Sequence, residues 1–173
     1  MSSLKFHIAQ TDLGIIAMVF SRYGLWAVSP PLASEEAARE RLPEWNASEP
    51  ISADEAAPVA ERLRRHLRGE PVCYDGVAVD WSGVADFSRR AMEAALSIPW
   101  GQTRTYSWLA TEAGNPRASR AAGQAMARNR LAIVVPCHRV LASDGSLCGY
   151  AGGLDVKRRL LDLERGSERP SRR

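Results

Sequence analysis

The sequence has few of the residues that build a disulfide framework or a metal site. It contains three cysteines and three histidines, and none of them forms a CxxC pair, an HExxH segment or another cluster with metal-binding spacing. It also has no uninterrupted apolar run of about 18 residues, the length that a membrane-spanning helix needs. The first residues lack the basic segment and apolar run of a secretion leader. These absences predict a cytoplasmic protein with free thiols, no membrane span and no bound metal.

Lysine is almost absent, and arginine carries most of the positive charge. The only lysines are Lys5 and Lys157, and the net charge of the 173 residues is +3. Residues 1–85 carry 8 Lys and Arg against 12 Asp and Glu, whereas residues 86–173 carry 15 against 8. A basic second half favours a polyanionic partner, although a solvated basic surface with a basic tail at residues 169–173 explains the charge equally well. The ordinary composition, 45% hydrophobic and 25% charged, excludes collagen-like and wholly disordered chains.

The first half has the pattern of a small sheet with helices. Short β-rich runs separated by turn residues predict strands, and apolar residues at spacing four before Gly69 predict a helix. Nothing in this half suggests chemistry by itself. The expected elements are strands at 4–9, 14–20, 25–28 and 77–79, a helix at 34–42, an irregular connection at 43–57 and a helix at 58–67.

The second half is predicted to be mostly helical. Thr105 is a suitable cap for one helix, and Asn115, between Gly114 and Pro116, is a suitable cap for the next. Two helices joined by a three-residue turn predict a helix-turn-helix. The expected elements are helices at 87–98, 106–113, 117–128 and 155–165, and a buried strand or strand-like segment at 131–135.

The helix expected at 117–128 is rich in alanine, glycine and serine and has arginines on and just after it. Small side chains let a helix backbone approach another surface closely, which suits phosphates and a narrow groove better than base reading in the major groove. A helix buried against its neighbour has the same composition. The pattern alone does not separate these two interpretations.

Cys137 and His138 follow a continuous apolar run. A cysteine beside a histidine can be a nucleophile with its base, but adjacent side chains rarely point the same way, so His138 would reach Cys137 through a water. Glu164 lies on the apolar side of the last expected helix, where a carboxylate needs a partner. It either orients His138 or reaches solvent at the helix end. Cys73 and Cys148 are interpreted as ordinary cysteines.

The residues around Cys137 carry a motif. Pro136-Cys137-His138-Arg139-Val140 resembles the motif of the O6-alkylguanine-DNA alkyltransferases, also called methylated-DNA–protein-cysteine methyltransferases. The resemblance extends over roughly residues 98–166 in one order, which makes it highly specific. The other matching positions are Tyr106, Gly114-Asn115-Pro116, Arg120, Gly123, Met126, Asn129, Gly149-Tyr150, Gly152-Gly153, Lys157, Leu160-Leu161 and Glu164.

The resemblance implies an α/β + α fold. A small ribonuclease-H-like α/β domain at 1–83 would precede a mostly helical, DNA-binding domain with a helix-turn-helix at 84–168, followed by the basic tail at 169–173. It also implies direct reversal of alkylation damage in double-stranded DNA by a monomer, without a cofactor. O6-alkylguanine, flipped out at the minor groove, would lose its alkyl group to Cys137 once per protein molecule. O4-alkylthymine is a second candidate substrate.

The family pattern also implies which residues contact DNA. Arg120 resembles the arginine that fills the space left by the flipped nucleotide, and Tyr106 resembles the tyrosine that crowds the 3′ phosphate. The expected DNA-binding residues are Tyr106, Arg117, Ala118, Ser119, Arg120, Ala121, Gly123, Gln124 and Arg128.

Catalytic roles follow from the same resemblance. His138 would be a water-mediated base for Cys137, oriented by Glu164. Tyr106 and Lys157 would offset the charge that develops on the leaving guanine. Asn129 resembles the hinge between the recognition helix and the active-site strand. The expected substrate pocket consists of Met126, Val140, Tyr150, Ala151 and Gly152.

The chain departs from the family pattern at three positions. Ala151 stands where some members carry serine, so its contribution must come from its backbone N–H. Arg130 and Ala132 replace prolines common before the motif, which implies a more flexible pocket rim. The zinc of some relatives needs a Cys/His set that Cys73 and the histidines at 7 and 66 do not supply.

Three other classes fit less well. Alkyltransferase-like binding modules replace the cysteine that is present here as Cys137. A Cys-His hydrolase would turn over repeatedly and would have no use for a helix-turn-helix. Regulators of the adaptive response add a Cys-rich metal-binding domain, for which three cysteines are too few.

Overall fold

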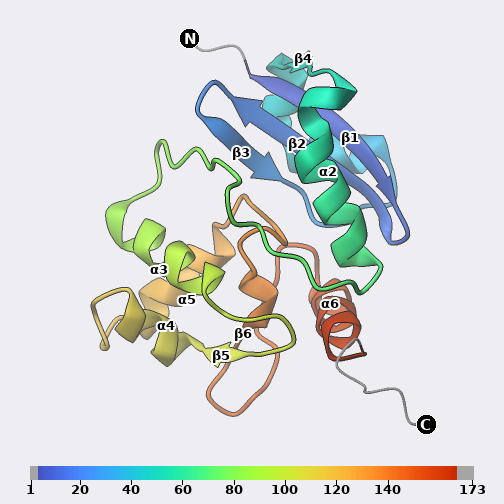
Figure 1. Cartoon of the computed structure of the whole chain (residues 1–173). Coiled ribbons are helices and arrows are strands. Elements are labelled where there is room, and N and C mark those ends of the chain that lie inside the picture. The colour runs from blue at the N-terminus through green and yellow to red at the C-terminus, as the bar shows by residue number, and fades with distance from the viewer. Residues whose placement is uncertain (1–3, 167–173) are drawn as a thin grey trace, which may run out of the picture.

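Figure 1 shows two parts that follow one another along the chain. We call residues 4–85 the sheet part and residues 86–166 the helical part. The structure is a computed structural model that describes residues 4–166. The expected basic tail at 169–173 and the last residues of the expected domain at 84–168 lie outside the described residues. Within residues 4–166, no helix is long and apolar enough to cross a bilayer.

The sheet contains the three predicted strands and a short fourth one. β1 (Lys5–Thr11), β2 (Gly14–Ser21) and β3 (Gly24–Val28) form two antiparallel hairpins, and β4 (Glu49–Pro50) pairs in parallel with β1. The strand order is β3-β2-β1-β4. β2 is buried on both faces: Ile16 and Met18 lie in one core cluster, and Ala17 and Val19 lie in another with Trp45. This explains the continuous apolar run of β2.

The helices of the sheet part begin at serine caps. Ser34 caps α1 (Glu35–Arg41), and a 3-10 turn, η1 (Pro43–Ala47), follows it. The side chain of Ser52 accepts a bond from the Glu55 N–H and caps α2 (Ala53–Leu67). The predicted start of this helix at Pro58 is therefore wrong, because the serine cap acts before the proline does. The expected irregular connection at 43–57 is replaced by η1, β4 and the first turn of α2.

The helical part contains α3 (Asp86–Leu96), α4 (Tyr106–Glu112), α5 (Ser119–Ala127) and α6 (Leu154–Gly166). Thr105 caps α4, as predicted. The predicted start of α5 at Arg117 is wrong. Asn115 does not cap a helix, because its side chain accepts the N–H of Arg117 in the preceding turn, and Ala118 occupies the cap position. The other elements are β5 (Arg104–Thr105), the 3-10 turn η2 (Cys137–Arg139) and β6 (Val140–Leu141), and β5 and β6 pair in parallel.

Two predicted strands do not form as strands. The run at 131–135 is buried, but it bends, and Ile133 has a φ of 71°. Asn129 holds the bend with its side chain, because its Oδ1 accepts the Leu131 N–H at 2.9 Å and its Nδ2 donates to the Val135 carbonyl at 3.1 Å. The expected strand at 77–79 makes one isolated bridge, between Val79 and Leu25.

The two parts share one hydrophobic core. The larger cluster of buried residues joins Met18 of β2 and Leu63 of α2 to Met92 of α3 and Leu160 of α6. The backbone also connects them, since the Val28 N–H donates to the Arg130 carbonyl at 2.7 Å. The position of the helical part is therefore fixed by residues of the sheet part.

Candidate functional site

Cys137 begins the turn η2 and is almost completely buried, with 6% of its surface exposed. The bend before it is fixed by Asn129, whose Nδ2 also donates to the Cys137 Sγ at 3.2 Å. Burial raises the pKa of the Cys137 thiol, and the bond from Asn129 and the charge of Lys157 oppose this rise. At neutral pH the thiol is therefore protonated and needs a base before it can act as a nucleophile.

Lys157 supplies a buried cation near Cys137. Its side chain is fully buried, and its Nζ donates to the carbonyl oxygens of Val140 at 2.8 Å and Cys148 at 3.3 Å. Burial lowers the pKa of Lys157, and a negative charge at Cys137 would raise it. The lysine connects the segments before and after the 142–147 loop and favours an anion at the sulfur.

Glu164 of α6 is the centre of a buried hydrogen-bond network. Its Oε1 lies 2.7 Å from Nε2 of His138, as expected for a carboxylate that orients this histidine. Arg139 donates from Nε to Oε2 at 2.8 Å and from Nη2 to Oε1 at 3.0 Å. The Gly101 N–H donates to Oε2 at 3.2 Å. These donors hold the pKa of Glu164 well below its usual range, although burial alone would raise it.

His138 presents its other ring nitrogen without a partner. It is completely buried, and Nδ1 has no hydrogen-bond partner among the described residues. Burial lowers the pKa of His138 to about 4, against the opposing effect of Glu164. Because the carboxylate accepts at Nε2, the neutral ring carries its proton there and keeps a lone pair at Nδ1. A neutral imidazole with a free, buried lone pair is a base.

The sequence interpretation missed His66 as a member of this network. His66 lies on α2, is fully buried, and its Nε2 is 3.0 Å from the same Oε1 of Glu164. The sequence did indicate that His66 is buried, because it lies three residues after Leu63 on the apolar face of α2. The role of Arg139 as a ligand of Glu164 was also not predicted, although Arg139 is part of the motif.

The network has three atoms of the types that bind metals. One ligand atom from each of His66, His138 and Glu164 lies within 4.8 Å of the others. The set differs from the one considered from the sequence, since it combines His66 with residues of the helical part. A dication here would displace both histidine N–H donors and would lie beside the guanidinium of Arg139 on the same carboxylate. The N–H groups of both histidines and of Arg139 therefore suit hydrogen bonding to the Glu164 carboxylate better than they suit a metal ion at this place.

An open cavity of about 580 Å³ lies beside α5. Six of the predicted site residues surround it, namely Tyr106, Ser119, Arg120, Gly123, Tyr150 and Ala151. Met126 and Val140 do not line it and are buried. Gly152 also does not line it; a Cβ at this position would lie 2.8 Å from Cβ of Pro30, so the turn there requires glycine.

The phenol groups of Tyr106 and Tyr150 lie in the electrostatic reach of Cys137. Burial and the neighbouring cysteines raise the pKa of Tyr106 to about 12, and burial also raises the pKa of Tyr150. Both side chains therefore keep their O–H at neutral pH and can donate hydrogen bonds. The hydroxyl oxygen of Tyr150 is buried without a partner among the described residues. The Cβ position of Gly123 lies 3.8 Å from the Tyr106 ring, so α5 packs closely against it.

Helix α5 has a buried face and an exposed face, so the interpretation as a helix packed against its neighbour holds for the buried face, and contact of the exposed face with DNA stays a prediction. Ala122, Ala125 and Met126 are buried in the core. The opposite face and the turn before it are accessible to a partner. The exposed expected DNA-binding residues are Arg117, Arg120, Ala121, Gln124 and Arg128, and the half-buried ones are Ala118, Ser119 and Gly123.

Arg130 differs from the other arginines of this region. Its Nη2 donates to the carbonyl oxygens of Asp80 at 2.7 Å and Ser82 at 3.0 Å, and its guanidinium lies 4.3 Å from the ring centre of Trp26. These contacts connect the end of α5 to the sheet part. The side chain that replaces a common family proline is thus used inside the molecule.

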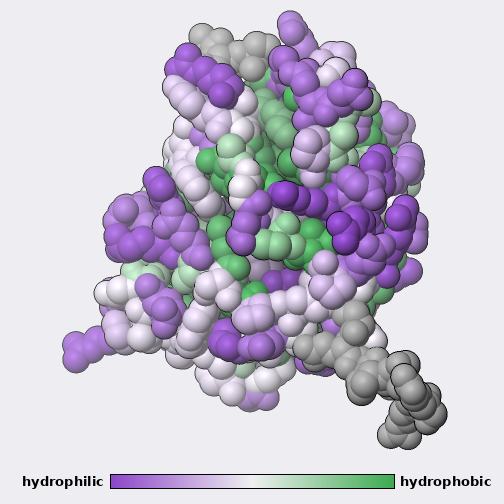
Figure 2. Space-filling model, in the orientation of Figure 1, coloured by the Kyte–Doolittle hydropathy of each residue, from purple (hydrophilic) through white to green (hydrophobic). Residues whose placement is uncertain are grey.

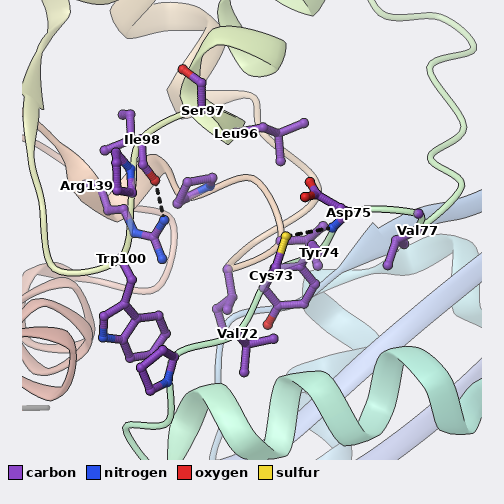
Figure 3. A pocket seen from close by; sticks show the side chains of 16 residues that line it. Val72, Cys73, Tyr74, Asp75, Val77, Leu96, Ser97, Ile98, Trp100 and Arg139 are labelled. Atoms are coloured by element: carbon purple, nitrogen blue, oxygen red, sulfur yellow. Dashed lines mark hydrogen bonds between the residues drawn. The ribbon is translucent and has the colours of Figure 1, made fainter.

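A second cavity, of about 590 Å³, lies between the segments 71–77 and 96–100. Figure 3 shows Arg139 and Trp100 on one side of it and Cys73, Tyr74 and Asp75 on the other. None of the predicted site residues lines it, and its wall shares no residue with the cavity beside α5. Figure 2 shows hydrophobic groups at the centre of the face crossed by the loop after α2, surrounded by hydrophilic ones.

Comparison with known families identifies one match in the helical part. The family described as "6-O-methylguanine DNA methyltransferase, DNA binding domain" matches residues 86–166. A relative from Mycobacterium tuberculosis, a methylated-DNA–protein-cysteine methyltransferase, is 45% identical over 105 residues, which are 61% of this chain and 62% of the relative. In sequence, the alignment thus spans about three fifths of the length of this curated relative.

Solved structures match nearly the whole chain. The O6-methylguanine methyltransferase of Mycobacterium tuberculosis is 32% identical, with a TM-score of 0.77 over 98% of this chain and 96% of that chain. The structure of Mycobacterium tuberculosis OGT in complex with DNA is 33% identical, with a TM-score of 0.77 over 96% of both chains. The structural likeness therefore covers nearly the whole chain, whereas the sequence alignment with the curated relative covers 61% of it.

Proposed function

The chain belongs to the 6-O-methylguanine DNA methyltransferase family, and from that premise we propose that it removes alkyl groups from O6-alkylguanine in double-stranded DNA by transferring them to Cys137. The observation that supports this most directly is the buried thiol of Cys137, which interacts electrostatically with Tyr106 and Tyr150, two residues that line the cavity beside α5. O4-alkylthymine is a second candidate substrate, because it also carries an alkyl group on an exocyclic oxygen.

DNA approaches along the exposed face of α5, the second helix of the proposed helix-turn-helix. The small side chains on this face, such as Ala121, allow the helix backbone to enter the narrow minor groove. Arg120 fills the space in the base stack, and Tyr106 crowds the phosphate, so that the alkylated nucleotide turns outward into the cavity. Flipping costs a few kcal/mol of unstacking, and least for a base that pairs badly.

The transfer is an SN2 displacement in which every proton has a place. Nδ1 of His138 takes the proton of Cys137 through a bridging water, and Glu164 stabilises the resulting imidazolium. The thiolate attacks the alkyl carbon, a C–S bond forms, and the C–O bond to guanine breaks with its electron pair going to O6. A proton from Tyr106 or Lys157 neutralises the leaving base. The product is a thioether, so each molecule reacts once and needs no cofactor.

The remaining organisation follows from the same proposal. Residues 1–83 form a ribonuclease-H-like domain and residues 84–168 form the DNA-binding domain, and the protein acts as a monomer. A reaction that depends on a free thiol fits a reducing compartment, which we take to be the cytoplasm. The expected pocket residues Met126 and Val140 lie in the same buried cluster as Cys137, against which Tyr106 and Tyr150 pack, and Ala151 contributes its backbone N–H.

The test is the stoichiometry of transfer. We expect the protein, incubated with duplex DNA carrying O6-methylguanine, to gain the mass of one methyl group per molecule. Cys137→Ala abolishes the gain, and Cys73→Ala, which removes an exposed cysteine outside the site, leaves it unchanged. Repeated turnover would indicate a hydrolase instead, and DNA binding without transfer would indicate a binding module; either result contradicts the proposal.

A further inference from the structure

His66 is the one histidine of the hydrogen-bond network around Glu164 that comes from the sheet part of the chain. It stands in the last turn of α2, 98 residues before Glu164 in sequence, and its side chain is fully buried. Its ring centre lies 4.6 Å from that of Trp100 and 5.8 Å from that of His138. None of the proton transfers in the proposed reaction involves its ring.

The hydrogen bonds determine the proton positions on both rings. An ionised carboxylate accepts but does not donate, so His66 and His138 both carry a proton on the Nε2 atom that faces Glu164 Oε1. The remaining nitrogen of His66, Nδ1, lies 3.3 Å from the hydroxyl of Tyr74. Burial raises the pKa of Tyr74, so the phenol keeps its O–H and donates it to Nδ1. His66 is thereby locked in the tautomer that donates to Glu164.

Two imidazole N–H groups and the Nη2 atom of Arg139 thus share one carboxylate oxygen. Each donor withdraws negative charge from Oε1 and makes it a weaker base. A weaker base at Oε1 binds less strongly to the imidazolium of His138 than a carboxylate without these donors. It also keeps the proton on Nε2 of His138 from moving to Glu164 during the reaction.

We propose that His66 is a positioning residue for alkyl transfer: its N–H, on the same oxygen as that of His138, holds Glu164 ionised and keeps Nδ1 of His138 free to accept the proton of Cys137. The inference rests on the proposed function for its chemistry, but not for its geometry. It gives the sheet part a direct connection to the reacting groups. The titratable and charged groups around His66 are His138, Arg139, Glu164 and Tyr74.

The experiment compares two substitutions with different donors. His66→Phe keeps a flat ring and removes the N–H, and His66→Gln retains an N–H donor at a similar distance. Without the donor, Oε1 becomes more basic and stabilises protonated His138. We expect the pKa of His138, about 4 in the parent protein, to rise by about one pH unit in His66→Phe and to return to the parent value in His66→Gln.

The readout is the imidazole NMR signal of His138 between pH 3.5 and 7, which needs neither DNA nor an alkyl donor. The chain has only three histidines, so the signals can be assigned by substitution. His7→Phe, in which a half-buried histidine of β1 is removed, is the matched control and leaves the His138 midpoint unchanged. A His138 midpoint that stays the same in folded His66→Phe, or that rises equally in His66→Gln, overturns the proposal.

Kinetics test the consequence for the reaction. The rate of reaction with free O6-benzylguanine falls on the acid side as His138 becomes protonated, and we expect this midpoint to move upward by about one pH unit with His66→Phe, with about twofold less activity at pH 5 and little change at pH 7. A residue with only a structural role would lower the rate equally at every pH. If the protein transfers no alkyl group, the proposed function fails while the NMR titration still tests His66.

A second variant covers the case in which His66→Phe does not fold. Tyr74→Phe leaves His66 in place and removes the hydroxyl that donates to its Nδ1. Without that donor the ring of His66 is less polarised, so its Nε2 N–H is a weaker hydrogen-bond donor to Glu164. We expect the same upward movement of the His138 midpoint, with a smaller size; an unchanged midpoint in folded Tyr74→Phe contradicts the proposed lock.

Discussion

The buried charges of the site compensate one another residue by residue. Glu164 is paired with Arg139 through two hydrogen bonds, so neither charge is buried alone. Lys157 contacts two carbonyl oxygens, and the charge that would complement it is the thiolate of Cys137. Burial disfavours that thiolate in the resting protein. The cation therefore favours the charged form of the sulfur only when a base removes its proton.

Glu164→Gln tests the buried ion pair between Glu164 and Arg139. The amide has the size of the carboxylate but leaves the guanidinium of Arg139 buried without its counter-charge, which costs about 3–5 kcal/mol. We expect the unfolding free energy from urea titration at pH 7 to fall by about this amount and the ionisation midpoint of Cys137 to rise. Glu112→Gln, at an exposed position on α4, is the control and leaves both quantities unchanged.

The same substitution predicts a change in acid stability. The folded-state pKa of Glu164 is depressed, so its stabilisation is complete above the unfolded pKa of about 4.3 and disappears as the pH falls toward the folded value. The parent protein therefore loses this contribution below about pH 4.3. Glu164→Gln never had it, and its unfolding free energy should vary less across this range. An identical pH dependence in both proteins contradicts a depressed pKa for Glu164.

At the scale of elements, α5 has a buried face and an exposed face. Its buried alanines pack in the core, whereas Arg120 is exposed at the cavity beside Tyr106. We expect Arg120→Ala to slow the repair of duplex DNA by at least about tenfold, because in the proposed mechanism the arginine fills the space that the flipped base leaves. Reaction with free O6-benzylguanine, which needs no flipping, should change less than twofold.

The control for Arg120 removes the same charge elsewhere. Arg159 is exposed on α6 and lines no part of the cavity beside α5. Arg159→Ala should leave both rates close to those of the parent protein, measured at one salt concentration because DNA binding depends on salt. Equal losses with the duplex and the free base in Arg120→Ala would place the arginine outside the flipping step.

Local sequence patterns predicted the elements that local interactions build. The hairpins of β1, β2 and β3 follow from β-rich runs with turns between them, and the cap at Thr105 follows from its side chain. The segment at 131–135, expected to be a buried strand or strand-like, is buried but does not form a strand, because the side chain of Asn129 bends it, and an apolar run does not reveal such hydrogen bonds. The start of α2 was wrong because Pro58 received more weight than the serine cap at Ser52.

The candidate site was predictable where one helix or one motif contains it. Glu164 is on the apolar side of α6, and its contact with His138 follows from the need to satisfy a buried carboxylate. The contact with His66 depends on how α2 lies against α6, and no local pattern determines that arrangement. His66 therefore remained a core residue of α2 until the fold brought it to Oε1.

At the scale of the whole molecule, the charge difference between the two halves has more than one cause. The exposed arginines of the α5 region can meet a polyanion, whereas Arg130 is used to connect the helical part to the sheet part through Trp26, Asp80 and Ser82. A count of charges does not separate these uses. Substitutions that change the stability of the protein and its DNA affinity differently do.

Arg130→Ala should therefore lower stability more than DNA binding. Two hydrogen bonds and a contact with the Trp26 ring are lost, so we expect the unfolding free energy to fall by about 1–3 kcal/mol. Arg130→Lys keeps the charge but not the planar group, so it should not restore stability. Arg128→Ala, at an exposed neighbour, should weaken DNA binding and leave stability unchanged. If Arg130→Ala weakens DNA binding without destabilising the protein, Arg130 belongs to the DNA surface, and the connection between the two parts depends on their shared core alone.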